Sequence, residues 1–208
     1  MQKGDFLDII LRSDKTIFTL KDIALLWQET STNTTRVRLN YYVKKGDLFR
    51  LRRGVYVKDK NYNKLELATK VFTPSYVSFE TVLAQEGLIF QYRSDITVAS
   101  YLNRNIEIDG QRYSYQKVKD SILINPRGII QTNNISVATK ERAILDTLYS
   151  NTDYHFDNTN GVEWEKVFEL LPMYQNHRLE KTVKLLVRKA AKDDARHFIA
   201  QNYSFSSP

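Results

Sequence analysis

The chain has 208 residues, 42% hydrophobic and 26% charged, which is ordinary for a folded globular protein of one medium or two small domains. It contains no cysteine, so disulfides and thiolate-bound metal sites are excluded. The longest apolar stretch near a predicted helix, Ile23–Trp27, is too short to span a bilayer, and Asp5 and Asp8 interrupt any signal-peptide core. We therefore expect a cytoplasmic protein that does not contact membranes.

The positive charge is concentrated near the N-terminus. The net charge of the chain is +7, and residues 31–60 alone hold 9 basic and 2 acidic side chains, whereas residues 61–208 hold 18 and 17. Such a concentration of positive charge is typical of a surface that binds a polyanion.

Three helices are predicted in this basic segment. The first covers 5–11, and Thr19 caps a second whose apolar stripe runs through 23–27. The third runs from Asn33 to Lys45 and ends at Gly46, which favours the left-handed conformation that closes a helix.

The third helix has an apolar face and a polar face. Thr35, Leu39, Tyr42 and Val43 gather on the first. The other mixes positive charge, hydroxyls and a small apolar group, which suits phosphates, base edges and thymine methyls. The candidate DNA-binding residues of this helix are Thr34, Arg36, Val37, Arg38, Asn40, Tyr41, Lys44 and Lys45.

A short hairpin follows the third helix. Its strands are 48–52 and 55–58, joined by a tight turn at Arg53 and Gly54. A hairpin directly after a recognition helix is the wing of a winged helix-turn-helix, and we expect Arg50, Arg52 and Arg53 to contact the sugar-phosphate backbone. Two alternatives stay open: the cations only solvate an exposed helix, or the winged helix binds a protein.

A polar stretch at 61–63 predicts a boundary between a winged helix-turn-helix domain, 1–62, and an α+β domain, 63–208. Ser78 is expected to cap a helix, Asp109 and Gly110 to form a hairpin turn, and Pro172 to end a helix. Helices are predicted at 64–72, 79–86, 140–149, 162–171 and 179–201, and strands at 96–101, 106–108, 112–118, 121–124, 128–131 and 135–137. This order indicates an α+β fold.

Three segments resemble the AbiEi antitoxins: GDLFRLRRGVYV at 46–57, YVSFETVLAQEGL at 76–88 and ISVATKERAILDTLY at 135–149. The likeness covers nearly the whole chain. It implies the antitoxin of a type IV toxin–antitoxin or phage abortive-infection system, encoded beside a nucleotidyltransferase-like toxin of the AbiEii type. It further implies repression of its own operon through the winged helix and neutralisation of the toxin through the C-terminal domain.

The third of these segments also has a structural interpretation. Thr139 caps a helix, Glu141 complements its N-terminus, and Arg142 pairs with Asp146 one turn later. Lys140 and Arg142 are expected to be exposed members that can serve a partner.

The last helix carries a second basic surface. Lys181, Lys184, Arg188 and Lys192 recur every three or four residues, opposite an apolar flank at 179, 183, 186, 187 and 190. Either this is the solvated side of an amphipathic helix, or it contacts nucleic acid or an acidic toxin surface.

No active site, metal site or cofactor site is expected. The glycines are too widely separated for a dinucleotide or Walker A loop, and there is no G-x-S-x-G motif. Glu107 and Asp109 have the spacing of nucleotidyltransferase carboxylates without the Gly-Ser turn, and Asp95 with this pair lacks the acidic-x-Lys signature of a nuclease. His155, His177 and His197 are scattered.

Three hypotheses about function follow. The first is a DNA-binding antitoxin that represses its own operon as two copies on an inverted repeat. The second is a module that neutralises the toxin by direct binding. The third is a winged-helix regulator whose C-terminal domain senses a ligand or partner.

Overall fold

The computed structural model describes the backbone of residues 5–91 and 93–203, and side chains from residue 6 to residue 191 within those ranges. It has the predicted α+β architecture, with helices packed on two sheets. The N-terminal elements are α1 (Asp5–Arg12), β1 (Ile17–Thr19), α2 (Leu20–Leu26), α3 (Thr32–Lys45), β2 (Phe49–Arg52) and β3 (Val55–Val57).

The predicted cap of α2 is confirmed. The Thr19 hydroxyl accepts from the Asp22 backbone N–H at 3.1 Å, and the Asp22 carboxylate accepts from the Thr19 backbone N–H at 2.9 Å, which completes a capping box. The strand β1 was not predicted. It pairs with β3 in the antiparallel sheet β1-β3-β2, where Ile17 lies opposite Val57.

This small sheet separates two cores. Successive residues of β3 point to opposite faces. Tyr56 therefore belongs to the smaller core together with Trp27 and Leu39 from the helices, whereas Val55 and Val57 belong to the larger core of the chain. The helices α1, α2 and α3 lie over one face of the sheet, and the rest of the protein lies over the other.

The remaining elements surround a six-stranded mixed sheet of order β6-β7-β5-β4-β9-β8. Its pairs are antiparallel except β5–β7 and β4–β9, which are parallel. The elements are α4 (Lys64–Val71), β4 (Ser75–Val77), α5 (Glu80–Gln85), β5 (Ile96–Ser100), β6 (Arg104–Ile108), β7 (Gln111–Lys117), α6 (Asp120–Leu123), β8 (Ile129–Thr132), β9 (Ile135–Ala138), α7 (Lys140–Ser150), α8 (Trp164–Leu170), the 3₁₀ helix η1 (Leu171–Tyr174) and α9 (His177–Tyr203).

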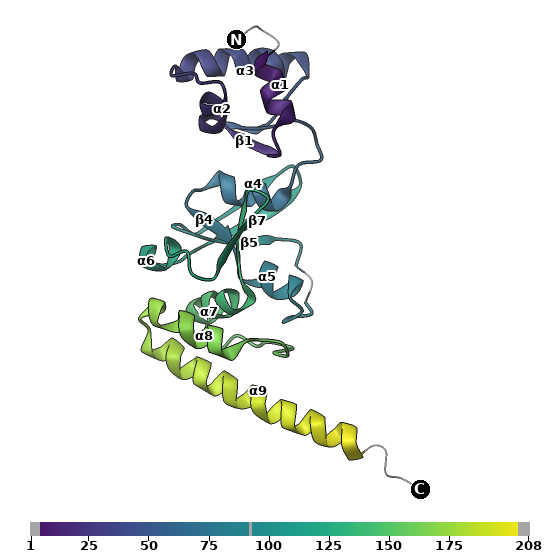
Figure 1. The fold of residues 1–208 in the computed structure, drawn as a ribbon, viewed down its shortest axis with the longest axis vertical. Coiled ribbons are helices and arrows are strands. Elements are labelled where there is room, and N and C mark those ends of the chain that lie inside the picture. The colour runs from purple at the N-terminus through teal and green to yellow at the C-terminus, as the bar shows by residue number, and fades with distance from the viewer. Residues whose placement is uncertain (1–4, 92, 204–208) are drawn as a thin grey trace.

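The molecule is elongated. Along its long axis, Figure 1 shows α1, α2 and α3 at one end, then α4, the large sheet, α7 and α8, with α9 at the opposite end. The helix α7 is central: residues 141–148 are all buried, and it packs against α5, α8 and α9. None of the helices in the described ranges is long and apolar enough to cross a membrane.

Two local predictions were wrong. Residues 121–124 were expected to form a strand, but 120–123 form the helical turn α6, because four residues are too few for apolar periodicity to distinguish the two. Ser78 was expected to cap α5, but Phe79 occupies the cap position with φ of 56°, and the Ser78 hydroxyl donates to Asp146 instead. The predicted end of the helix before Pro172 is confirmed, since α8 ends at Leu170. Pro172 lies in the first turn of the 3₁₀ helix η1, where its missing N–H costs no hydrogen bond.

At the predicted boundary, 61–63, hydrogen bonds connect the N-terminal segment closely to α4. The backbone N–H and the hydroxyl of Thr16 donate to Oε2 of Glu66 at 2.9 and 2.6 Å, and Asn63 N–H donates to the Thr16 hydroxyl at 2.9 Å. Only 1% of Glu66 is exposed. The division into two domains at residue 62 stays a prediction, and any such domains share the larger core through Ile17, Val55 and Val57.

Candidate nucleic-acid interface

The helix α3 is defined at both ends by its own sequence. At its start the Ser31 hydroxyl accepts from the Thr34 N–H at 3.2 Å, and at its end Gly46 has φ of 84°. The predicted apolar face is confirmed, because Thr35, Leu39 and Tyr42 are buried. These anchors fix which side of α3 faces outward.

The outward face of α3 lies at the end of the molecule farthest from α9 (Figure 1). Val37 and Tyr41, one helical turn apart, are 64% and 47% exposed and form a small apolar strip on this face. They help to line a shallow hollow of about 380 Å³ along the helix. The predicted site residues of α3 that the structure exposes are Thr34, Arg36, Val37, Asn40, Tyr41, Lys44 and Lys45.

The cations of α3 differ in their surroundings. In the described part of the chain, no carboxylate lies within ion-pair distance of Arg36 or Lys44. Lys45 pairs with Asp47 at 3.1 Å, and this hydrogen bond raises the pKa of the lysine. Arg36 and Lys44 are therefore the cations of this helix most available to an anion.

Arg38 is placed differently from the expectation that it projects from the polar face. Its guanidinium carbon lies 3.7 Å from the centroid of the Phe6 ring and 5.4 Å from that of Trp27, and one of its nitrogens is 3.7 Å from Glu29. Only 27% of the side chain is exposed. Arg38 thus joins α3 to α1 and α2.

The hairpin arginines do not share one surface. The β2–β3 register shifts between Arg50 and Arg52, so Leu51 is an additional bulged residue that breaks the two-residue alternation. Arg50 lies opposite Tyr56 and so shares the face of the sheet that α3 covers. The Arg52 guanidinium lies on the other face, 5.8 Å from the centroid of the Phe72 ring. Arg53 is exposed in the turn.

The second basic surface lies on α9, at the opposite end of the molecule (Figure 1). Lys181, Lys184 and Arg188 are exposed, and Lys184 donates to Oε1 of Glu180 at 2.6 Å. The apolar flank is confirmed, since Leu179, Val183 and Ala190 are buried. The side chain of Lys192 lies outside the described residues.

Two of the three carboxylates considered for catalysis, Asp95 and Asp109, have structural partners. Asp95 pairs with Arg112 at 3.1 Å, and Glu107 lies opposite the same arginine in the β6–β7 pairing. Asp109 accepts from the Tyr62 hydroxyl at 3.0 Å; burial and this bond raise the pKa of Tyr62 to about 12. Across the described residues, no three His, Cys, Asp or Glu side chains are grouped to hold a metal ion.

The two histidines whose side chains the structure describes lie at different places. His155 lines a cavity beside α9, and His177 lies 3.2 Å from Glu180. The side chain of His197 lies outside the described residues.

Arg142 was expected to be exposed and available to a partner, but it belongs to a buried ionic cluster with Asp146. Asp146, one turn along α7, accepts from the hydroxyls of Tyr76, Ser78 and Tyr174 at 3.0, 2.8 and 2.7 Å. Burial raises the pKa of both tyrosines well above the usual value, so they remain donors. Arg142 is fully buried, so its predicted exposure was wrong.

Arg142 of this cluster also binds backbone carbonyls of α6 and of the loop that follows it. Arg142 donates through Nη2 to the Ile122 carbonyl at 2.6 Å and through Nη1 to the carbonyls of Asn125 and Arg127. Its Nε lies 3.7 Å from Asp146, as the predicted one-turn spacing requires. The sequence shows this spacing, but the burial of the pair depends on segments 15 to 70 residues away.

The N-terminal segment is similar to a known family of transcriptional regulators. Residues 5–57 match the family model described as "Transcriptional regulator, AbiEi antitoxin". The match begins with α1 and ends with β3, so it confirms the resemblance to AbiEi antitoxins for the segment that carries the basic helix. None of the curated proteins searched matches the chain.

Proposed function

We propose that residues 5–57 form a winged helix-turn-helix that binds duplex DNA and regulates transcription. The observation that carries this proposal is the outward face of α3, where Arg36 and Lys44 lie beside exposed Val37 and Tyr41 at the free end of the molecule. The match to AbiEi transcriptional regulators over the same residues supports it independently.

In this proposal α3 enters the major groove and the β2–β3 hairpin is the wing. Thr34, Val37 and Asn40 face base edges and thymine methyls, because they combine hydroxyl, methyl and amide groups on one exposed strip. Arg36, Lys44, Lys45, Arg50 and Arg53 contact phosphates. Arg38 and Arg52 act indirectly, since each is held against an aromatic ring of the protein.

We further propose that the chain is a cytoplasmic type IV antitoxin without catalytic activity. It represses its own operon as two copies on inverted repeats, and residues 63–208 neutralise a nucleotidyltransferase-like toxin of the AbiEii type. Exposed Lys181, Lys184 and Arg188, with Lys192, form a surface for the toxin or for nucleic acid, and their positive charge suits an acidic partner. Neither direct toxin contact nor a cofactor is required for the autorepressor activity.

A promoter fusion tests this function. The upstream region of the operon is placed before a reporter, and wild type is compared with Arg36→Ala/Lys44→Ala. Repression by wild type that is lost in the double variant, at equal protein levels, supports the proposal. Equal repression by both proteins overturns the assignment of α3.

A second candidate is a regulator whose C-terminal domain senses a ligand. A cavity of about 590 Å³, lined by residues between 69 and 136 together with Lys15 of the N-terminal segment, favours this candidate. Lys15, which precedes β1, and Lys70 of α4 both line it, and no carboxylate does. Absence of a nucleotidyltransferase gene beside this one would favour the sensor, whereas loss of toxicity when the two are co-expressed would favour the antitoxin.

A further inference from the structure

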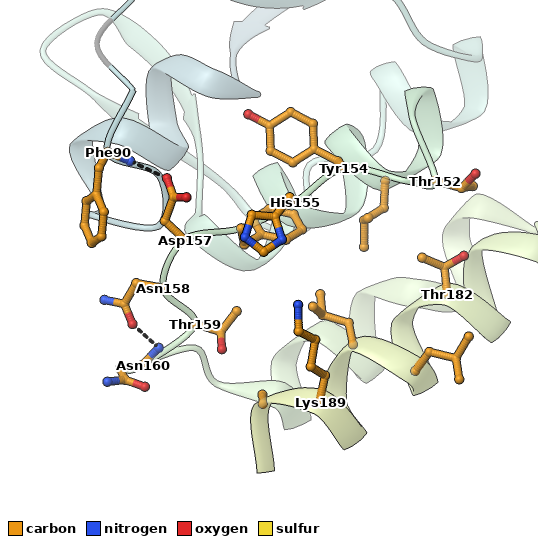
Figure 2. Close-up of a pocket in the computed structure, with 15 residues that line it drawn as sticks. Phe90, Thr152, Tyr154, His155, Asp157, Asn158, Thr159, Asn160, Thr182 and Lys189 are labelled. Atoms are coloured by element: carbon orange, nitrogen blue, oxygen red, sulfur yellow. Dashed lines mark hydrogen bonds between the residues drawn. The ribbon is translucent and has the colours of Figure 1, made fainter. Parts of the chain in front are cut away.

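A second cavity, of about 610 Å³, lies between α9 and the segment 152–160 (Figure 2). The helix α9 is at the end of the molecule away from α3 (Figure 1). Its volume falls within the range of about 300–1,000 Å³ that small-molecule sites usually have. The function proposed for α3 makes no use of it.

The wall formed by segment 152–160 is held in place by backbone contacts. Asp157 N–H and Asn158 N–H both donate to the Leu88 carbonyl, at 3.0 and 3.2 Å, and the Asp157 carboxylate accepts from Phe90 N–H at 2.7 Å. Asn160 N–H donates to the Asn158 side chain at 2.9 Å (Figure 2). The cavity therefore has a preorganised wall.

The floor of the cavity is apolar and its mouth carries an exposed aromatic ring. Leu148, Phe156 and Ala190 are buried beneath it. Phe90 at the rim is 73% exposed, the second most exposed of the large apolar side chains after Leu25 among the described residues. An exposed ring beside an apolar floor is suited to the flat face of an aromatic ligand.

The polar groups of the cavity favour an anion. Lys189 extends from α9 toward the opposite wall, which carries His155 and Thr159 (Figure 2). Asp157 is the only carboxylate among the lining residues; it is committed to Phe90 N–H, and within the described chain it forms no ion pair with Lys189. A ligand with negative charge near Lys189 gains a charge-assisted hydrogen bond.

We propose that this cavity binds a nucleotide unit, with the phosphate at Lys189 and the base against Phe90 and the apolar floor. A nucleotide combines the two features that the lining selects, a planar aromatic ring and an adjacent anion. The unit can be a free nucleotide or the end of a single strand, since both present the same base and phosphate. The proposal does not depend on duplex binding by α3.

The test uses the full chain and two probes. Calorimetric titration with AMP, GMP, CMP and UMP detects free nucleotides, and fluorescence anisotropy of a labelled single-stranded RNA tetramer detects a strand end. Saturable binding of a mononucleotide identifies the ligand as a free nucleotide. Binding of the tetramer alone identifies it as the end of a single strand. Binding of neither probe overturns the proposal.

Matched variants locate the site. Lys189→Glu should weaken binding about tenfold or more through loss of a charged hydrogen bond, and Phe90→Ala about fivefold or more through loss of stacking. Arg178, which is exposed on α9 and does not line the cavity, is the control position. Arg178→Glu makes the same charge change on this helix and should leave affinity within about twofold. Equal losses for Arg178→Glu and Lys189→Glu overturn the proposal, because they indicate non-specific attraction to a basic helix.

The same variants separate this proposal from the function assigned to α3. Arg36→Ala/Lys44→Ala should retain nucleotide binding and lose promoter binding. Phe90→Ala should retain promoter binding and weaken nucleotide binding about fivefold or more. Loss of nucleotide binding in the α3 double variant would overturn the cavity as the site.

Discussion

The Arg38 guanidinium lies 3.7 Å from the centroid of the Phe6 ring, which attaches the middle of α3 to α1. Its neighbour Arg36 is exposed and makes no comparable contact among the described residues. We expect Arg38→Ala to lower the free energy of unfolding by about 1–2 kcal/mol, because the cation–π contact is partly buried. Urea denaturation followed by circular dichroism measures this loss.

Arg36→Ala is the matched control. It should change stability by less than about 0.5 kcal/mol and still weaken duplex binding. Equal destabilisation by the two substitutions would contradict the distinction between an arginine that organises the helix and one that faces DNA.

We expect the effects of substituting Arg142 and Asp146 on the free energy of unfolding to be strongly non-additive. Both side chains have no exposed area, so Arg142→Met or Asp146→Leu leaves the other charge buried without its partner. Each single substitution should cost about 3–5 kcal/mol, and the double substitution much less than the sum. Chemical denaturation of the four proteins gives the coupling energy, and a purely additive cycle would show that the pair does not act as a unit.

We expect the Asp22 carboxylate to account for part of the stability that the protein loses at acid pH. Burial alone raises its pKa, but hydrogen bonds from Thr19 and Lys15 outweigh burial and leave the pKa lowered. The ionised carboxylate therefore stabilises the fold above the usual aspartate pKa of about 3.9, and this stabilisation is lost as the pH falls through the lowered value. Asp22→Asn should have a smaller loss of stability on acidification than wild type.

Asp14→Asn provides the comparison, since Asp14 is exposed and has no ion pair in the described chain. Its unfolding free energy should follow the wild-type pH dependence. If Asp22→Asn also followed the wild-type pH dependence, the capping box would not be a source of the loss of stability in acid.

The junction at Thr16 and Glu66 predicts that the chain unfolds as one unit. Trp164→Phe leaves Trp27 as the only tryptophan, so fluorescence reports the N-terminal segment while circular dichroism reports the whole chain. The two thermal midpoints should coincide. In the Glu66→Ala background they should separate, because the Thr16 donors lose their acceptor; coincident midpoints in that background would show that Glu66 does not couple the two segments.

Local signals in the sequence predicted local structure well. The Thr19–Asp22 pair marked the start of α2, Gly46 marked the end of α3, and Asp109–Gly110 formed the hairpin turn, where both residues have positive φ. Each of these depends on residues within a few positions of one another. The concentration of basic residues at 31–60 and the two faces of α3 follow from the same short-range pattern.

Features that depend on distant segments were missed. The strand β1 is three residues long and exists through pairing with β3, whose Val57 is far along the chain from Ile17. The bulge at Leu51 turned Arg52 away from Arg50, although simple alternation placed them together. Phe90 and Lys189 are separated by about half of the chain and meet around one cavity only after folding.

The salt dependence of duplex binding tests the central claim most directly. If about six phosphates are neutralised, log affinity for the promoter inverted repeat should fall with log salt at a slope near −5. Arg36→Ala/Lys44→Ala removes two contacts and should make the slope shallower by about 2, whereas Arg104→Ala on β6 should leave it unchanged. A wild-type slope near zero, or the same slope in the α3 double variant, would contradict the assignment of α3 as the DNA-binding helix.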